Sequence, residues 1–192
     1  MKKADNLSLV NKFLIATPEL EDVHFHRGVV YVCAHSEEGA MGMVINRPFL
    51  DMNLADVFAE MKIEVDKNLQ LPSTVLLGGP LQPDRGFVLH KPQQQQHWQS
   101  TLVVDNVVAV TSSQDILQAM ARNQGPSEAL MILGYCGWTA GLVEQEIAKN
   151  DWLVAPADLE ILFSVPFGER WQRAIKSLGF NPDNLSDDMG HA

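Results

Sequence analysis

The chain has 192 residues, which is enough for one domain with a hydrophobic core, since single domains usually span about 50–200 residues. Its 14 basic and 24 acidic residues give a net charge of −10, which weighs against direct contact with nucleic acid or an anionic membrane surface because both need clustered lysine and arginine. No apolar run approaches the roughly 20 residues of a membrane-spanning helix, and no apolar stretch follows Lys2 and Lys3 as in a signal peptide, so we expect a cytoplasmic protein without a membrane partner.

The first part of the chain predicts a hairpin followed by a helix. Residues 27–34 are apolar and largely β-branched, which is typical of a strand covered on both faces. A second strand is predicted at 41–46, after a Glu-Glu-Gly turn at 37–39. Apolar residues at helical spacing over 54–61, preceded by Asn53 as a capping residue, predict the first helix.

The middle of the chain predicts four more strands. Two of them, at 75–77 and 86–90, are short apolar segments. The other two, at 102–104 and 107–110, flank Asp105 and Asn106, which both tolerate positive φ and therefore predict a two-residue hairpin turn.

The second half predicts four helices, with one more strand at 130–133 between the first and the second of them. One begins at 112–115, where Ser112 and Asp115 resemble a capping box, and another is expected at 139–149. A third should begin with Pro156, and an apolar stripe over 171–178 predicts a fourth that ends at Gly179. Because hairpins dominate the first half and strict strand–helix alternation is absent, the pattern favours an α+β fold with a mixed sheet.

Several motifs occur in a fixed order along the chain. The first group is Leu14-Ile15-Ala16-Thr17-Pro18, Asp22, Phe25, Arg27 and the string from Gly39 to Asn46-Arg47-Pro48. The second is Leu77-Gly78-Gly79-Pro80, Val88-Leu89-His90, Leu133-Gly134-Tyr135, Gly137-Trp138, Glu144, Glu146-Ile147 and Asn150-Asp151-Trp152-Leu153. Together they resemble the YqgE/AlgH family over roughly residues 9 to 180.

This resemblance implies a complex α+β fold in which a branched, mixed and largely antiparallel sheet closes into a pseudo-barrel flanked by helices. We therefore expect one domain over residues 1–180 and an acidic, flexible tail over 181–192. The resemblance implies no established enzyme activity, although some members have been described as transcriptional regulators. The chain departs from the family at Cys136, where a small residue such as Ala is common, and at Leu142, where Gln is common.

Two strand ends carry the candidate binding site. Arg47 follows one predicted strand, and Gly78 and Gly79 follow another, so a guanidinium and two backbone amides could together bind a carboxylate or phosphate. Gly137 and Trp138, after the predicted strand 130–133, complete this candidate site. The structural alternative is that Arg47 pairs with Asp22 and the glycines only form turns.

Residues 130–141 read as a strand, a glycine-rich turn and the start of a helix, which places Cys136 at a turn. A hydrolase or transferase could use a cysteine there together with His90 or His35 as a base. The glycines match no nucleotide-binding motif, and the structural alternative is a buried, inert thiol.

No metal or cofactor is expected. His24 and His26 could share one side of an extended segment, but no third ligand stands at a metal-site spacing. Glu144 and Glu146 face different ways on the predicted helix, so they form no acid–base pair, and one of them could bind Arg27 or Arg47.

The sequence thus favours a non-enzymatic cytoplasmic protein that binds an unknown protein or a small anionic ligand, or that regulates transcription indirectly. A Cys136-dependent enzyme and a direct DNA-binding regulator remain alternatives, and the net charge disfavours the second. Neither the ligand nor the oligomeric state follows from the sequence.

Overall fold

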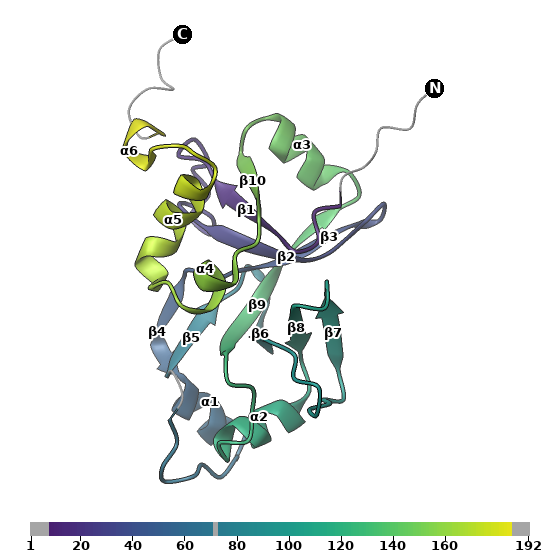
Figure 1. Ribbon diagram of the computed structural model, residues 1–192, viewed down its shortest axis with the longest axis vertical. Helices are drawn as coiled ribbons and strands as arrows, with labels where there is room; N and C mark the ends of the chain where they lie inside the picture. The colour runs from purple at the N-terminus through teal and green to yellow at the C-terminus, as the bar shows by residue number, and fades with distance from the viewer. Residues whose placement is uncertain (1–7, 71–72, 186–192) are drawn as a thin grey trace.

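The computed structural model describes residues 8–70 and 73–185, so most of the predicted tail lies outside the described residues (Figure 1). The strands are β1 (Lys12–Ala16), β2 (Val29–Ser36), β3 (Gly39–Val44), β4 (Pro48–Asn53), β5 (Thr74–Leu77), β6 (Leu81–His90), β7 (Thr101–Val104), β8 (Val108–Thr111), β9 (Ala129–Thr139) and β10 (Trp152–Pro156). The helices are α1 (Leu54–Glu60), α2 (Gln114–Ala121), α3 (Leu142–Ala148), α4 (Leu159–Phe163), α5 (Arg170–Ser177) and α6 (Pro182–Leu185), with a 3₁₀ turn at Phe167–Glu169.

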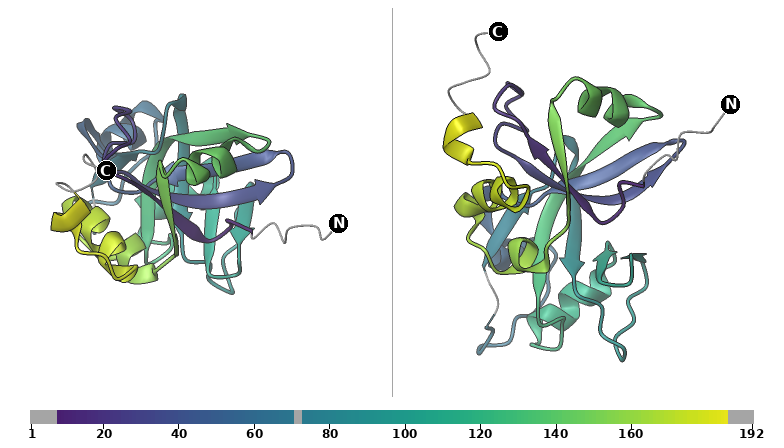
Figure 2. Two further views of the ribbon diagram at one scale, coloured as in Figure 1. Left: turned by 90° about the horizontal axis from the view of Figure 1, so that it is seen from above. Right: turned by 45° about the horizontal axis from the view of Figure 1, so that its top comes forward.

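Strand β9 joins the whole sheet. The main strand order is β10-β1-β2-β3-β9-β6-β8-β7, and β5, which also pairs with β4, lies parallel to β9. The other pairings of the described strands are antiparallel. The sheet branches at β9 and curls into a half-barrel flanked by helices, as the views in Figure 2 show. The predicted α+β class with a mixed, largely antiparallel and branched sheet is therefore confirmed.

Local sequence signals explain two of the connections. Asp105 and Asn106 have φ of 48° and 56°, in the left-handed region that both residues tolerate, and the predicted β7–β8 hairpin forms there. Its turn has three residues rather than the predicted two, because Val104 pairs with Val108 and leaves Val107 in the turn. Asn53 caps α1, because its side chain accepts from the backbone N–H groups of Ala55 and Asp56 while Asp56 accepts from the Asn53 N–H.

The glycine-rich segment at residues 130–141 does not have the predicted turn. Strand β9 does not end at Leu133 but continues through Gly134 and Gly137 to Thr139, so the expected turn and helix start are absent from that position. The extension is possible because its end pairs with β3, from Gly39 opposite Thr139 to Gly42 opposite Cys136. Pairing with a strand far away in sequence decides this conformation.

Other boundaries also differ from the predictions. Pro156 ends β10 rather than beginning a helix, and α4 is capped instead by Asp158. The predicted capping box at Ser112 is not formed, because α2 begins one residue later and its N-cap, Ser113, makes no capping hydrogen bond. Strands β1, β4 and β10 were not predicted, although α5 and its end at Gly179 were.

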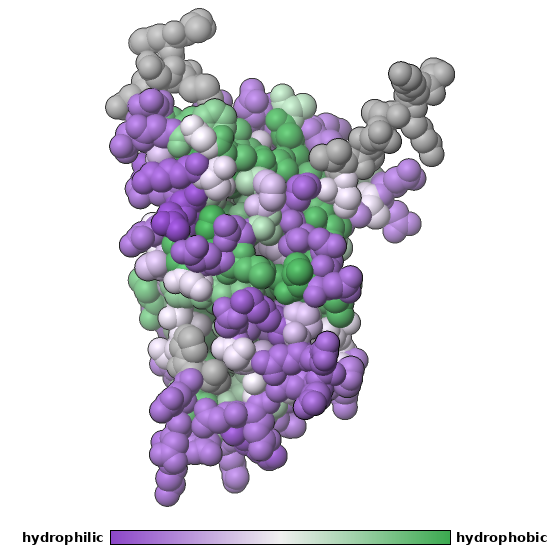
Figure 3. Space-filling model, viewed as in Figure 1, coloured by the Kyte–Doolittle hydropathy of each residue, from purple (hydrophilic) through white to green (hydrophobic). Residues whose placement is uncertain are grey.

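Alternate residues of β1 and β2 face two separate core clusters. Phe13 and Tyr31 pack with Trp171 of α5 on one face, while Leu14 and Val30 pack with Trp138 on the other, where α3 lies. A third cluster lies beneath α1 and α2 at the opposite end of the molecule. In Figure 3 this end is mostly hydrophilic on its outer surface, whereas apolar residues gather nearer the middle and top of the same face.

Candidate functional site

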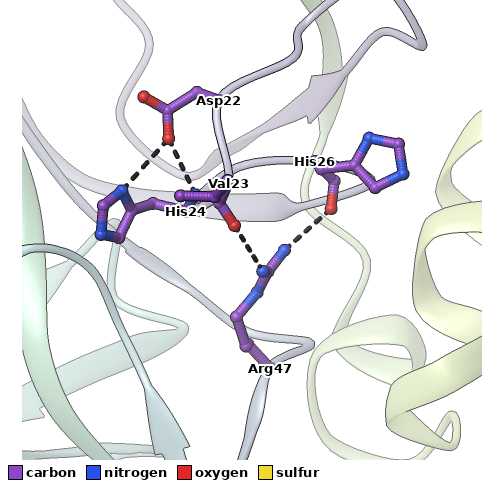
Figure 4. Close-up of polar contacts among 5 residues, drawn as sticks. All are labelled: Asp22, Val23, His24, His26 and Arg47. Atoms are coloured by element: carbon purple, nitrogen blue, oxygen red, sulfur yellow. Dashed lines mark hydrogen bonds and ion pairs between the residues drawn. The ribbon is translucent and has the colours of Figure 1, made fainter.

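Arg47, in the short connection between β3 and β4, anchors the loop that joins β1 to β2. Its Nη1 donates to the carbonyl of Val23 (2.9 Å) and its Nη2 to the carbonyl of His26 (2.8 Å), as Figure 4 shows. Asp22 instead accepts from the backbone N–H of His24 (2.8 Å) and contacts the ring of that histidine. The expected ion pair between Arg47 and Asp22 is therefore not formed.

Asn46 fixes the next part of the same loop. Its Oδ1 accepts from the N–H of Val29 (2.9 Å), and its Nδ2 donates to the carbonyl of Arg27 (2.8 Å). Arg27 has φ of 51°, a left-handed conformation that is uncommon for a residue with a large side chain. The Asn46 and Arg47 side chains thus hold the loop in a shape that presents the Arg27 side chain.

A hollow of about 330 Å³ opens beside these residues. One wall comes from the loop and the end of β3, and the other from the start of α5 and the turn before it. Its lining residues are His26, Arg27, Asn46, Arg47, Pro48, Phe167, Gly168, Trp171 and Gln172. The guanidinium of Arg27 lies over the Trp171 ring, 5.3 Å from its centroid, a cation–π contact that links the two walls.

A third guanidinium lies next to this wall in the core. Arg170 is 1% exposed and donates to the carbonyls of Ile45 (2.6 Å) and Val165 (2.9 Å). Burial lowers the pKa of Arg170 to about 10, so the side chain still carries its charge at neutral pH. Its contact with the Phe167 ring, 4.4 Å from the centroid, also stabilises that charge.

Across residues 8–70 and 73–185, no carboxylate forms an ion pair with Arg27, Arg47 or Arg170. The expectation that Glu144 or Glu146 would bind Arg27 or Arg47 is wrong. Two guanidiniums without a carboxylate partner, those of Arg27 and Arg47, therefore line one hollow of a protein whose net charge is −10, and a third, that of Arg170, is buried beside its α5 wall.

Glu144 and Glu146 have other partners. Glu144 Oε1 accepts from His35 Nε2 (2.7 Å), because the Leu9 N–H donates to His35 Nδ1 and so assigns the ring hydrogen to Nε2. Burial alone would raise the pKa of Glu144, but its hydrogen bond with His35 lowers it. Glu146 Oε2 accepts from the indole N–H groups of Trp138 (2.7 Å) and Trp152 (2.8 Å).

Gly78 and Gly79 lie close to Arg47 through the backbone. The Leu77 N–H donates to the Arg47 carbonyl (2.8 Å), while the Gly78 N–H donates to Leu133 (2.7 Å) and is already used. A Cβ at Gly79 would lie 2.4 Å from the Tyr135 carbonyl, so this glycine permits close approach to β9. Neither glycine lines the hollow.

Gly137 and Trp138 lie in β9 and also do not line the hollow. The Trp138 ring is buried in the second core cluster, where Phe25 stacks on it at 6.5 Å and meets Trp152 edge to face at 5.3 Å between ring centroids. Because Phe25 belongs to the loop held by Arg47, Trp138 stabilises that loop by packing against Phe25. Trp138 is thus connected to the hollow only through packing.

Cys136 lies inside β9 rather than at a turn. Its Sγ–H donates to the Gly78 carbonyl (3.2 Å), and burial raises the pKa of its thiol to about 12. The two histidines proposed as bases bind elsewhere: His35 binds Glu144, and His90 binds Thr111 Oγ1 (2.9 Å). The turn geometry required by the Cys136-dependent enzyme is therefore absent.

Among the described residues, no three His, Cys, Asp or Glu side chains gather as metal ligands would. His24 pairs with Asp22, whereas His26 lines the hollow. No helix in the described ranges is long and apolar enough to cross a membrane.

Sequence reasoning missed the second wall of the hollow. The sequence predicts Trp171 only as part of a helix, and no pattern in it singles out Phe167, Arg170 or Gln172. The signal that could have pointed to them is an arginine directly beside a buried aromatic stripe, since a buried arginine needs acceptors from elsewhere in the fold.

Comparison with known proteins identifies the family. A family model described as AlgH-like matches residues 13–183. The chain belongs to the AlgH-like family. The predicted resemblance to YqgE/AlgH proteins is thereby confirmed.

Related proteins cover this AlgH-like chain almost completely. A UPF0301 protein of Thioalkalivibrio sulfidiphilus is 52% identical over 186 residues, which span 96% of this chain and 97% of that protein. A UPF0301 protein of Photobacterium profundum is 45% identical over 190 residues, which span 97% of this chain and 100% of that protein. These relatives establish the family and say nothing of a ligand.

Solved structures share the fold. The solution structure of the AlgH protein from Pseudomonas aeruginosa matches with a TM-score of 0.76 at 42% identity and covers 100% of both chains. A protein from Corynebacterium diphtheriae matches with a TM-score of 0.70 at 22% identity, over 97% of this chain and 93% of that one. The curled sheet is therefore common to distant sequences.

Proposed function

We propose that this AlgH-like protein is a non-enzymatic binding protein whose hollow between the β1–β2 loop and α5 takes the carboxylate or phosphate group of a small anionic ligand. The observation that carries the proposal is that the guanidiniums of Arg27 and Arg47 line one hollow without a carboxylate partner, while the buried Arg170 adds a third positive charge beside its wall. An anion would supply the missing negative charge.

Unused hydrogen-bond donors support an anionic ligand. A guanidinium has about five N–H groups. Arg47 uses two of them on Val23 and His26, and within the described ranges the Arg27 side chain makes no hydrogen bond at all. Guanidinium groups bind carboxylate and phosphate in a bidentate geometry, and those of Arg27 and Arg47 are already positioned by the Trp171 ring and the loop carbonyls.

The size of the hollow favours a small ligand. Its volume of about 330 Å³ lies at the lower end of the range for small-molecule sites, which is about 300–1,000 Å³. A duplex of nucleic acid would need a broad basic surface rather than a hollow of this size. If the protein regulates transcription, we infer an indirect route in which the bound anion changes its affinity for another protein.

The cytoplasmic setting expected from the sequence belongs to the same proposal. Cys33 and Cys136 are both free and buried, which is ordinary where thiols stay reduced.

Isothermal titration of the full chain with inorganic phosphate, pyrophosphate and citrate tests the proposal. We expect saturable binding of at least one anion, at one site per chain, which weakens as the salt concentration rises. Arg27→Gln should weaken that binding by about tenfold or more, because a hydrogen bond to a charged group contributes about 1.5–3 kcal/mol.

Arg122→Gln is the matched control, because it removes the same charge from an exposed position at the end of α2. It should leave anion binding unchanged. The proposal fails if none of the three anions binds, or if Arg122→Gln weakens binding as much as Arg27→Gln.

A further inference from the structure

A second and larger cavity lies between α1 and α2, over the face of the sheet. Its volume is about 700 Å³, in the range of small-molecule sites, which is about 300–1,000 Å³. The two helices stand at the end of the molecule that is lowest in Figure 1, away from α5 and the arginine-lined hollow. We refer to this cavity as the apolar cleft.

The floor and walls of the apolar cleft are hydrocarbon and thioether surfaces. They come from β4, α1, β5, β6, α2 and β9, in the form of Phe49, Met52, Val57, Met61, Leu77, Val88, Leu117, Met131 and Leu133. Methionine side chains adapt their shape to an apolar ligand. A Cβ at Gly86 would lie 2.7 Å from the end of the Met131 side chain, so the absence of a side chain at Gly86 allows Met131 to pack in the floor of the cleft.

The polar group set deepest in the apolar cleft is already satisfied. Thr111 is fully buried, and its Oγ1 is bonded to His90 Nε2 (2.9 Å) and Thr101 Oγ1 (2.8 Å). A ligand body that carried its own donors or acceptors would leave them unpaired here, which costs about 1–3 kcal/mol for each group. The occupant that fits such a floor is a hydrocarbon chain rather than a sugar or a nucleobase.

The charged groups of the lining, Glu60, Asp84 and Arg85, are exposed and lie at the mouth. The register shift between Leu81 and Gly86 lifts Pro83, Asp84 and Arg85 out of the β6–β9 ladder to the rim. Within the described residues Arg85 forms no ion pair; its Nη1 donates to Gln82 Oε1 (3.3 Å), and its guanidinium lies over the Phe87 ring at 5.2 Å. Its other N–H groups are free to bind an anionic head group.

Two carboxylates limit the charge of that head group. Glu60 and Asp84 also lie at the rim, so a doubly charged phosphate would meet repulsion that a single carboxylate meets only weakly. We propose that the apolar cleft binds a straight-chain carboxylic acid, with its hydrocarbon chain between α1 and α2 and its carboxylate at Arg85. This site is separate from the proposed anion hollow, and neither proposal depends on the other.

Titration of the full chain with a series of straight-chain carboxylates, from hexanoate to tetradecanoate below their micelle concentrations, tests the proposal. Binding should strengthen by about fourfold for each added methylene, as expected for burial of a CH₂ group, until the chain fills the cleft. Dodecanoate should bind more tightly than dodecylamine, because Arg85 receives the head group. An affinity that is independent of chain length, or tighter binding of the amine, would overturn the proposal.

Two variants fill the apolar cleft from opposite walls. Met61→Trp acts from the end of α1, and Ser112→Trp acts from the exposed residue before α2. Each should weaken dodecanoate binding by about tenfold or more, while circular dichroism shows a folded chain. Normal binding in both folded variants would overturn the proposal.

The head-group assignment has its own matched pair. Arg85→Gln should weaken dodecanoate binding and leave dodecanol binding unchanged, whereas Arg122→Gln should change neither. Arg27→Gln should also leave dodecanoate binding unchanged, which separates this site from the anion hollow. Equal effects of Arg85→Gln and Arg122→Gln would contradict a carboxylate at Arg85.

Discussion

Arg170 and Glu146 each bind neutral partners only, but they do so on opposite faces of β1 and β2. Arg170 lies inside the core and donates to the carbonyls of Ile45 and Val165. Glu146 is half-buried and accepts from two indole N–H groups. The comparison teaches that backbone carbonyl dipoles can stabilise the charge of a fully buried cation, whereas the charge of a half-buried carboxylate is also stabilised by solvent.

The largest effect is expected at Arg170. Arg170→Met should lower the free energy of unfolding by about 3 kcal/mol, because two carbonyls in the core lose their donor and each such loss costs about 1–3 kcal/mol. Urea unfolding followed by circular dichroism measures the change.

Arg173→Met on the same helix is the control. Its guanidinium forms an ion pair with Glu160 (3.2 Å) at the surface, so the loss should be about 0–1 kcal/mol. If both variants lose a similar free energy of unfolding, burial of the guanidinium makes no difference and the contrast drawn for Arg170 is wrong.

A smaller effect is expected at Glu146. Glu146→Leu should lower the free energy of unfolding by about 2 kcal/mol, since the Trp138 and Trp152 N–H groups lose their common acceptor. Glu146→Gln keeps an acceptor oxygen of the same shape and should lose about 1 kcal/mol or less.

Urea unfolding of both Glu146 variants, side by side, gives the measurement. If Glu146→Gln lowers the free energy of unfolding as much as Glu146→Leu, the two indole N–H groups require the negative charge and not only an acceptor oxygen. Arg170 and Glu146 would then differ only in their exposure to solvent.

The smallest effect is expected at His90, a buried side chain that is neutral in the folded chain and makes stability depend on pH. Burial lowers the pKa of His90, and the hydrogen bond of its Nδ1 with the Lys91 carbonyl only partly opposes this. The unfolded chain therefore binds a proton more readily than the folded one. The stability from His90 is complete above the unfolded pKa, about 6.5, and is lost as pH falls toward the lower folded pKa.

Thermal unfolding between neutral and mildly acidic pH should show this loss. His90→Asn should flatten the pH dependence, and His97→Asn, at an exposed position, should not. An unchanged pH dependence in His90→Asn would show that other groups cause it.

Much of the fold follows from short-range sequence signals, as the Asp105-Asn106 turn and the Asn53 cap illustrate. The course of β9 does not, because Gly134 and Gly137 look like turn residues until β3 and β6 are present to pair with them. The same holds for the candidate site: Arg47 is visible in the sequence, but its actual partners and the Arg170–Trp171 wall come from segments that only the folded chain brings together. Local chemistry predicts elements, whereas long-range pairing decides what a glycine or an arginine does.

The position of β9 in the chain also has a consequence for synthesis. Among the strands of residues 8–70 and 73–185, the β1–β2–β3 part of the sheet pairs with the β6–β8–β7 part only through β9, and β5 also pairs with this strand. A ribosome must therefore deliver β9 before the two parts can be joined, and until then β3 and β6 are each left with an unpaired edge. Contacts of such long sequence separation form slowly, so the nascent chain exposes these edges until β9 has been synthesised.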